Sequence, residues 1–339
     1  MTSENVKSTV ERLSALVRAF EGRRVVVLGD LIADQFVSGE ISRVSREAPV
    51  MILRHERTET VPGGAANCAM NFAALGARAA IVGVVGDDSA GRELLGKLEG
   101  AGVDCSGVVV VPGHSTTTKM RILAGHAHST RQQVVRLDYE GGALKDEGVL
   151  ADIASNVGAA FEEAEAAVVS DYNYGVACET TVAPLRHVER SAPVVVDSRF
   201  RMREFAGFDS ATPNEDEVEQ VAGRRFADAS ELAAEGERLR AELGYTSLLI
   251  TRGKHGMVLL EEGKAALHLE AVGSHDAVDV TGAGDTVIAT YALALASGAD
   301  FPTAARLANH AGGVVVLKRG TATVNPQELL ASLEHEGQV

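Results

Sequence analysis

The sequence predicts an α/β fold, in which a doubly wound, mostly parallel central sheet carries helices on both faces and a small β-sheet forms a lid. Short runs of Val, Ile and Ala that are apolar on both faces alternate with segments of helical periodicity. Such alternation indicates βα units, whose ligands bind at the carboxyl ends of the strands. The expected strands are 24–28, 79–85, 107–111, 166–169, 193–196 and 247–251, and the expected helices include 65–75 and 89–101.

Two segments differ from this pattern and predict the lid. Residues 32–60 and 116–136 alternate polar and apolar side chains, are rich in Arg, Thr and His, and lack helix-start signals. We expect short strands of an accessory sheet over the crevice. Since the sequence contains no internal repeat or linker, residues 1–339 are expected to form a single domain.

The composition excludes several classes of partner. Lys and Arg total 32 against 47 Asp and Glu, a net charge of −15, so attraction to nucleic acid or an anionic membrane is not expected. Three dispersed cysteines favour a reducing compartment over a disulfide framework. With neither a signal-peptide pattern nor an apolar run near the roughly 18 residues of a membrane span, we expect a cytoplasmic protein.

The segment 278–286 is the strongest indication of chemistry, because a Gly-rich turn precedes an apolar, helix-forming run at 287–296. Backbone amides of Gly282, Ala283 and Gly284 can bind an anion at a helix N-terminus. Asp285 then lies where a general base could accept a proton from an attacking hydroxyl. The alternative is an ordinary turn and N-cap. The pattern therefore favours phosphoryl transfer to an alcohol.

Four motifs, spread over nearly the whole chain, resemble the PfkB (ribokinase-like) family of carbohydrate kinases. They are Gly63-Gly64-Ala65-Ala66-Asn67, Gly86-Asp87-Asp88-Ser89-Ala90-Gly91, Asn214-Glu215-Asp216-Glu217 and Asp279-Val280-Thr281-Gly282-Ala283-Gly284-Asp285. Within that family the chain is most similar to the kinases of D-glycero-D-manno-heptose 7-phosphate. That similarity rests on Gly29-Asp30-Leu31-Ile32-Ala33-Asp34, Ser42-Arg43-Val44-Ser45-Arg46-Glu47-Ala48-Pro49-Val50, Pro62-Gly63-Gly64-Ala65-Ala66-Asn67, Thr118-Lys119-Met120-Arg121 and Gln132-Gln133-Val134-Val135-Arg136-Leu137-Asp138.

The resemblance implies ATP, Mg²⁺ and a sugar or sugar phosphate as ligands. The product would be a heptose 1,7-bisphosphate that feeds ADP-heptose and lipopolysaccharide synthesis. A kinase for another sugar, such as fructose or ribose, and a non-catalytic nucleotide or sugar sensor remain alternatives. Because no G-x-G-x-x-G follows the first strand, a dinucleotide-dependent oxidoreductase is not favoured.

Several residues are candidates for binding the sugar. The resemblance places Asp34 against two sugar hydroxyls, although a solvated surface Asp is the alternative. Gly63 and Gly64 allow close backbone approach at a helix start, and Asn67 can donate and accept at once, as a polyol requires. Simple capping of that helix is the alternative.

Four cations in the lid segments form a candidate phosphate site. These are Arg43 in the first segment, with Lys119, Arg121 and Arg136 in strand-like alternation in the second. Arg and Lys commonly gather around phosphates in this way. Charges on edge strands also protect against aggregation, which is the alternative.

The nucleotide and metal assignments follow from the resemblance. Asn214, Thr251, Gly253, Gly256 and Asn309 are expected to bind the nucleotide, and Glu217 to position Mg²⁺ through water. Asn214 alone also suits a plain N-cap. Asp279 and Thr281 are candidates for a monovalent cation such as K⁺.

Three departures put the substrate in doubt. Tyr174 stands where heptose-phosphate kinases usually carry Lys, Ser198-Arg199-Phe200-Arg201 replaces a Pro-Lys-Gly run, and Arg46 replaces a Pro. Two explanations are open: Arg199 or Arg201 restores the lost positive charge, or the acceptor is a different sugar. The sequence ends at Val339, so no nucleotidyltransferase domain is expected, and edge strands in the lid favour a homodimer.

Overall fold

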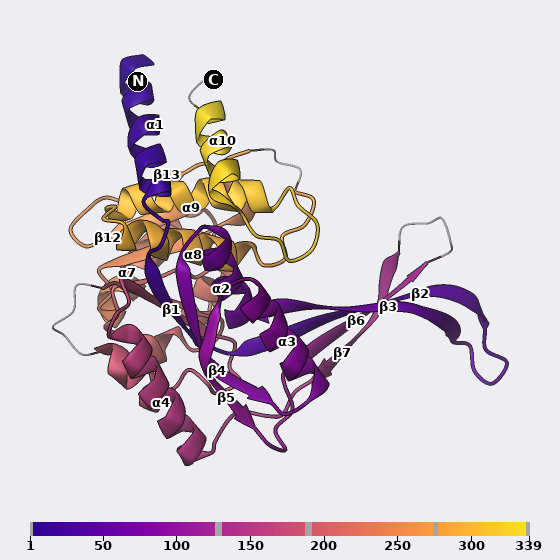
Figure 1. Cartoon of the computed structure of the whole chain (residues 1–339). Helices are drawn as coiled ribbons and strands as arrows, with labels where there is room; N and C mark the ends of the chain where they lie inside the picture. The colour runs from indigo at the N-terminus through magenta and orange to yellow at the C-terminus, as the bar shows by residue number, and fades with distance from the viewer. Residues whose placement is uncertain (1–2, 126–130, 187–191, 274–276, 337–339) are drawn as a thin grey trace.

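The central sheet confirms the predicted α/β fold. The computed structural model describes residues 3–125, 131–186, 192–273 and 277–336 (Figure 1). Within them one sheet has nine strands in the order β13-β12-β11-β10-β9-β8-β1-β4-β5, parallel from β11 to β5, with β12 and β13 antiparallel at one edge. The strands are β1 (Arg24–Gly29), β4 (Arg78–Gly86), β5 (Asp104–Val111), β8 (Ala166–Asp171), β9 (Val194–Ser198), β10 (Ser210–Ala211), β11 (Ser247–Thr251), β12 (Met257–Glu261) and β13 (Leu267–Leu269).

Helices cover both faces of this sheet because its strands are apolar on both. Val25 and Val27 of β1 pack into one core, and Val26 and Leu28 into the other, as the pleat requires. The first core includes α1 (Ser3–Arg18), α2 (Ala65–Ala74), α3 (Ser89–Gly100), α8 (Ala283–Ala296), α9 (Phe301–Val315) and α10 (Pro326–Glu336). The second includes α4 (Glu147–Phe161), α5 (Glu179–Val182), α6 (Glu215–Ala222) and α7 (Ala229–Leu243). The described segments also contain three short 3-10 helices, η1 (Ala183–Arg186), η2 (Met202–Phe205) and η3 (Gly253–His255).

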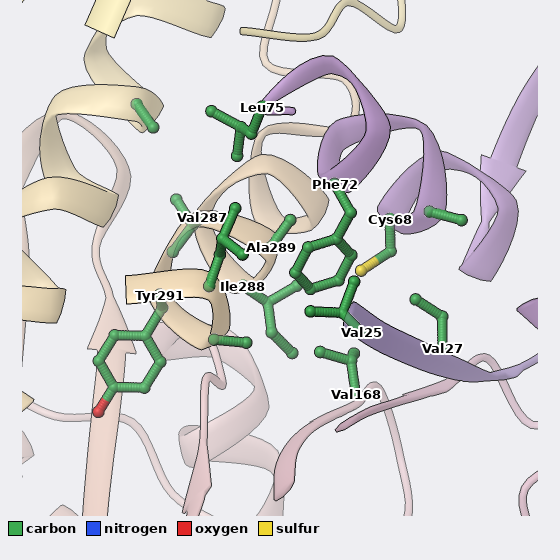
Figure 2. Close-up of a cluster of buried hydrophobic side chains, with 14 of the residues drawn as sticks. Val25, Val27, Cys68, Phe72, Leu75, Val168, Val287, Ile288, Ala289 and Tyr291 are labelled. Carbon is green, nitrogen blue, oxygen red and sulfur yellow. The ribbon is translucent and has the colours of Figure 1, made fainter. Parts of the chain in front are cut away.

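Helices α2 and α8 lie side by side on the first face, which brings two distant motifs together. Figure 2 shows Phe72 and Cys68 of α2 beside Ile288 of α8, above Val25 of β1. All four side chains are buried. The N-termini of both helices point to the carboxyl edge of the sheet, so the segments before α2 and α8 meet there.

The lid is a second sheet that projects from the body as an arm (Figure 1). Its order is β3-β2-β6-β7, formed by β2 (Leu31–Val44), β3 (Met51–Gly64), β6 (Thr118–Gly125) and β7 (Gln132–Tyr139). The predicted segments fall on these strands, with residues 126–130 outside the described part. The expectation of short strands is wrong for β2 and β3, which have 14 residues each. Register shifts at Ser38/Gly39 and Ile41/Arg43 let the ladder continue where the polar–apolar alternation breaks.

Strand boundaries otherwise differ by a few residues from the prediction. Strand β11 matches at both ends, whereas β5 begins three residues earlier than expected, at Asp104, with an irregular register against β4. None of the helices in the described segments is both long and apolar enough to cross a bilayer.

Candidate functional site

A polar cavity of about 360 Å³ opens at the carboxyl edge of the central sheet. Its walls come from the ends of β8, β9 and β11, the starts of α2, α6 and α8, and the base of the lid. This is where an open parallel sheet with helices on both faces binds its ligands. The lining residues are Ile32, Asp34, Gly63, Gly64, Asn67, Lys119, Arg121, Asp171, Tyr172, Asp197, Arg199, Thr212, Asn214, Glu217, Thr251, Val280, Thr281, Gly282, Gly284, Asp285 and Thr321.

Asp285, in the first turn of α8, is the buried carboxylate on the cavity wall that was predicted as the base. Only 5% of the residue is exposed. Asn67 Nδ2 donates to one carboxylate oxygen at 2.6 Å, and the Tyr172 hydroxyl donates to the other at 3.2 Å. Burial raises the pKa of Asp285 to about 6, against the opposing effect of these two donors. Such a carboxyl can accept a proton near neutral pH.

The Gly-rich turn before Asp285 fits its predicted anion site in part. Gly282 is the N-cap of α8 with φ +76°, and a Cβ there would lie 2.6 Å from Asn67 Nδ2. At Gly284 a Cβ would meet no heavy atom within 4 Å, so the glycine leaves open space on the cavity side. The Ala283 amide instead donates to the Val280 carbonyl at 3.2 Å.

Asp34 and the two glycines before α2 form one wall of the cavity. Asp34 is 7% exposed and accepts a hydrogen bond from the Arg121 guanidinium in an ion pair. A Cβ at Gly63 would lie 2.2 Å from Asp34 Oδ2, and one at Gly64, whose φ is +57°, would lie 2.7 Å from the Asp30 carbonyl. Both glycines are therefore needed for the close approach of the protein's own chain.

The structure brings two of the four predicted lid cations to the cavity. Lys119 lies 5.6 Å from the ring centroid of Tyr172 and 5.9 Å from that of Tyr174, and burial lowers its pKa. Arg121 lines the same wall. Arg136 faces Arg121 across the β6–β7 ladder but forms a two-pronged ion pair with Asp138, at 2.9 and 3.0 Å.

Arg43, the fourth cation, lies on the far half of the arm. It pairs with Ile52 of β3, nine positions beyond Asp34 along β2, or about 30 Å in an extended strand. Neither Arg43 nor Arg136 lines the cavity.

A second cavity, of about 170 Å³ and mostly apolar, adjoins the first and contains four of the predicted nucleotide residues. Thr251, Gly253, Gly256 and Asn309 line it, with apolar side chains such as Val287. The Asn309 amide donates to the Glu270 carbonyl at 2.6 Å, which ties α9 to the wall. Because Thr251, Val280 and Gly284 line both cavities, the two meet beside Asp285.

Asn214, the fifth nucleotide candidate, lies on the first cavity with Glu217 and also caps α6. The Asn214 side chain accepts from the Glu217 amide at 2.9 Å, and Glu217 accepts from the Asn214 amide at 2.8 Å, a reciprocal capping box. Asn214 therefore caps α6, as the alternative interpretation predicted, and also lines the cavity.

The carboxylates around Glu217 suit a cation. Burial raises the pKa of Glu217, and burial together with the charges of Glu217 and Asp285 raises the pKa of Asp197 well above its usual value. A cation bound nearby would stabilise the ionised form of these carboxyls and lower their pKa values. Among the described residues no group of three or more His, Cys, Asp or Glu could hold a metal by itself. Mg²⁺ there would keep waters and phosphate oxygens as ligands.

Asp279 connects the loop before α8 to the loop that contains Gly320. Its carboxylate accepts from the Thr281 amide and from the Gly320 amide, both at 2.9 Å. Although burial acts against ionisation, these hydrogen bonds leave the pKa of Asp279 lowered. A charged carboxylate therefore lies beside Thr281, just before the Gly-rich turn.

Several residues that line the cavity were not predicted as site residues: Asp171, Tyr172, Asp197, Thr212 and Thr321. Tyr172 is the most important, because it hydrogen-bonds Asp285. Most follow strands β8, β9 and β10, so the rule that ligands bind at the carboxyl ends of parallel strands would have found them.

The structure also separates Arg199 from Arg201. Arg201 is engaged by Asp171, the Ala177 carbonyl and Glu204. Arg199 lines the cavity, with its guanidinium 6.0 Å from the ring centroid of Tyr172. Tyr174, at the position of the missing Lys, donates its hydroxyl to Glu140 at 2.7 Å.

The order of the strands, the helices on both faces and the lid sheet define the class of fold, which is the ribokinase-like α/β architecture. Arabidopsis thaliana ribokinase, solved with ribose and ATP, has a TM-score of 0.70 at 20% identity, covering 92% of this chain and 99% of the other. Escherichia coli phosphofructokinase-2, solved with potassium, has a TM-score of 0.74 at 18% identity, covering 93% and 99%. These likenesses concern the fold alone.

The particular family follows from the sequence comparison. Residues 23–328 match the pfkB family carbohydrate kinases, and the chain belongs to that family. The predicted family and enzyme class, a phosphotransferase with an alcohol acceptor, are thereby confirmed. The chain is 42% identical over 318 residues to the bifunctional protein HldE of Pseudomonas paraeruginosa, and 43% identical over 312 residues to that of Pectobacterium atrosepticum. These matches cover 94% and 91% of this chain, but only 65% and 63% of the relatives' length.

Proposed function

We propose that this protein transfers the γ-phosphoryl group of ATP to a hydroxyl of D-glycero-D-manno-heptose 7-phosphate, giving the 1,7-bisphosphate. The observation that carries the proposal is the position of Asp285, a buried carboxyl of raised pKa at the junction of a polar and an apolar cavity. The similarity to HldE proteins supports the heptose pathway, in which the product would serve ADP-heptose and lipopolysaccharide synthesis in the cytoplasm.

In the proposed reaction the sugar hydroxyl gives its proton to Asp285 as its oxygen attacks the γ-phosphorus. A new O–P bond forms, the bond to the bridging oxygen of ADP breaks, and that oxygen leaves with its electron pair. Asp34 and Asn67 would orient the sugar, while the amides of Gly282 and Gly284 would face the transferred group. The Ala283 amide would join them only by leaving Val280.

The nucleotide would bind with its base in the apolar cavity and its phosphates directed toward Gly284. Thr251, Gly253, Gly256 and Asn309 would surround the base and ribose, with Asn214 nearer the phosphates. Mg²⁺, held by Glu217 through water, would neutralise phosphate charge. Asp279 and Thr281 would hold K⁺ beside the anion site.

The phosphate already on the substrate would bind at the base of the lid. Lys119 is there, and Arg121 can exchange Asp34 for a phosphate oxygen, which it can bind through two N–H groups. Arg199 would supply the charge lost at Tyr174. A different sugar acceptor is favoured only by these departures from the heptose-kinase pattern.

A homodimer is proposed from the arm. All eight residues of the edge strand β7 are exposed, among them Val134, Val135, Leu137 and Tyr139. A thin sheet with apolar side chains in water is stabilised when another surface covers it. Sedimentation velocity should show a dimer that Leu137→Glu dissociates, and a wild-type monomer at working concentration would contradict it.

The function is tested by measuring ADP release with Mg-ATP and heptose 7-phosphate, fructose 6-phosphate, fructose, ribose or adenosine, each against a blank without sugar. Selective turnover of heptose 7-phosphate is expected. Turnover of another sugar would keep the kinase and replace the substrate. If ATP binds but no sugar on the panel stimulates turnover, the proposal fails in favour of a sensor.

A further inference from the structure

A buried polar chain runs behind Asn67, away from the cavity. Asn67 Nδ2 donates to Asp285 Oδ2 at 2.6 Å. One turn further along α2, Asn71 Nδ2 lies 2.9 Å from the Asn67 carbonyl and 3.4 Å from Asn67 Oδ1. The Thr286 hydroxyl then donates to Asn71 Oδ1 at 2.8 Å. Neither Asn71 nor Thr286 has any exposed surface, and neither lines the cavity.

The backbone carbonyl of Asn67 fixes the direction of this chain, because a carbonyl can only accept. Asn71 must therefore turn its NH₂ group toward Asn67 and its oxygen toward Thr286. A second N–H of Asn71 then faces Asn67 Oδ1, which leaves the Asn67 NH₂ group for Asp285. If the Asn67 amide were reversed, its NH₂ would face the NH₂ of Asn71, and its oxygen would face the carboxylate.

We propose that Asn71 and Thr286 are positioning residues that hold the Asn67 amide with its N–H groups toward the Asp285 carboxylate. They touch neither cavity and act only through Asn67. The assignment rests on the proposed role of Asp285 as the base. The reversed amide suits only a protonated Asp285, so blocking the reversal keeps the carboxyl ready to accept the proton of a hydroxyl.

Other groups also act on Asp285 and would not be changed by substitutions in the chain behind Asn67. Tyr172 donates to the second carboxylate oxygen, the charge of Asp34 raises the pKa of Asp285, and the charge of Arg199 lowers it. Asp197 after β9 and Cys68 on α2 are further titratable neighbours that interact with Asp285. Because these groups stay in place, a change in the pKa of Asp285 in such a variant would reflect the orientation of the Asn67 amide.

The test is a titration of Asp285 that does not depend on turnover. Protein labelled with ¹³C at Asp Cγ is titrated by NMR, and the Asp285 signal is assigned by its loss in Asp285→Asn. Wild type should titrate near pH 6. Asn71→Leu should raise the midpoint by about half a unit to one unit, and Thr286→Val by less in the same direction. Thr286→Ser, which keeps the hydroxyl, should restore the wild-type midpoint.

Thr290→Val is the matched control, because Thr290 is equally buried one turn later on α8 and donates only to the Thr286 carbonyl, at 2.8 Å. Its midpoint should equal that of wild type. Unchanged midpoints in both Asn71→Leu and Thr286→Val would overturn the proposal, and if Asn71→Leu fails to fold, Thr286→Val against Thr286→Ser decides it.

Turnover against pH supplies the second readout. In Asn71→Leu the loss of kcat should be largest below pH 7 and shrink to within about threefold by pH 8.5, where the base is ionised again. A loss that is equal at every pH would indicate a structural role only and contradict the assignment. A wild type without any sugar-dependent turnover would refute the proposed function, while the NMR midpoints would still test the positioning role.

Discussion

The floor of the cavity, formed by Asn67, Tyr172, Arg199 and Asp285, and the lid arm use charge in opposite ways. On the floor, Asp285 is buried and its two oxygens accept from Asn67 and Tyr172, so that burial and hydrogen bonds together set its pKa. In the lid, Arg121 and Arg136 remain paired with acids on or beside their own sheet. Under the proposed function, the floor carries out the chemistry while the base of the lid recognises the substrate.

The largest expected effect is on the floor. Asp285→Asn keeps the shape of the side chain but removes the base, so kcat should fall by about 10²–10⁴-fold while the KM for ATP changes little. Steady-state ADP release measures both constants. Turnover near the wild-type value would remove Asp285 from the base role and with it the distinction between floor and lid.

Arg199 tests whether the floor also supplies positive charge. Arg199→Met should lower kcat/KM for the sugar phosphate by about 10- to 100-fold, because the guanidinium would bind the phosphate already on the substrate. Arg203→Met is the control, since Arg203 lies four residues further on and pairs with Glu242 outside the cavity. Equal kinetics for the two variants would refute a role for Arg199.

Gly63 joins the floor to the lid, so adding a single methyl group there should lower the rate of the reaction. Gly63→Ala would place a Cβ 2.2 Å from Asp34 Oδ2 and displace that carboxylate. A small displacement of a positioning group lowers kcat/KM for the sugar by about 10- to 100-fold. Gly96→Ala in α3, where a Cβ would meet nothing within 4 Å, should leave kinetics unchanged. If both variants behave alike, the tight contact at Gly63 has no functional role.

The smallest effects are expected in the lid, where two arginines face each other across one ladder. Arg121→Met should lower kcat/KM for a sugar phosphate by about tenfold, and by less for the unphosphorylated sugar. Arg136→Met should stay within about twofold, as is usual for an exposed ion pair. An equal loss in both variants would mean that the arm closes further over the cavity, or that a partner subunit completes the site.

The central sheet was the most predictable part of the fold. Strands apolar on both faces allow only a sheet covered on both sides, and β11 is predicted at both ends because its apolar run is sharply bounded. The length of β2 and β3 was not predictable, because bulges interrupt the alternation that would reveal a long strand.

The site was predictable where a motif carried it and not where loops did. Asp285, Asn67 and Asp34 come together as the sequence predicts. Tyr172 and Arg199 follow apolar strands without a motif of their own, and only the order of strands in the sheet brings them beside α8. The distances from Arg43 and Arg136 to the cavity depend on the path of the arm, which local pattern does not fix.

The role of Asp285 as the base is tested most directly by the dependence of wild-type kcat on pH with saturating sugar phosphate and Mg-ATP. Burial raises the pKa of Asp285 to about 6, and the base acts only when ionised. We expect kcat to be constant above about pH 7 and to fall tenfold per pH unit well below pH 6, as a single protonation requires. A kcat that stays constant to pH 4.5 would contradict the assignment of a buried carboxyl as the base.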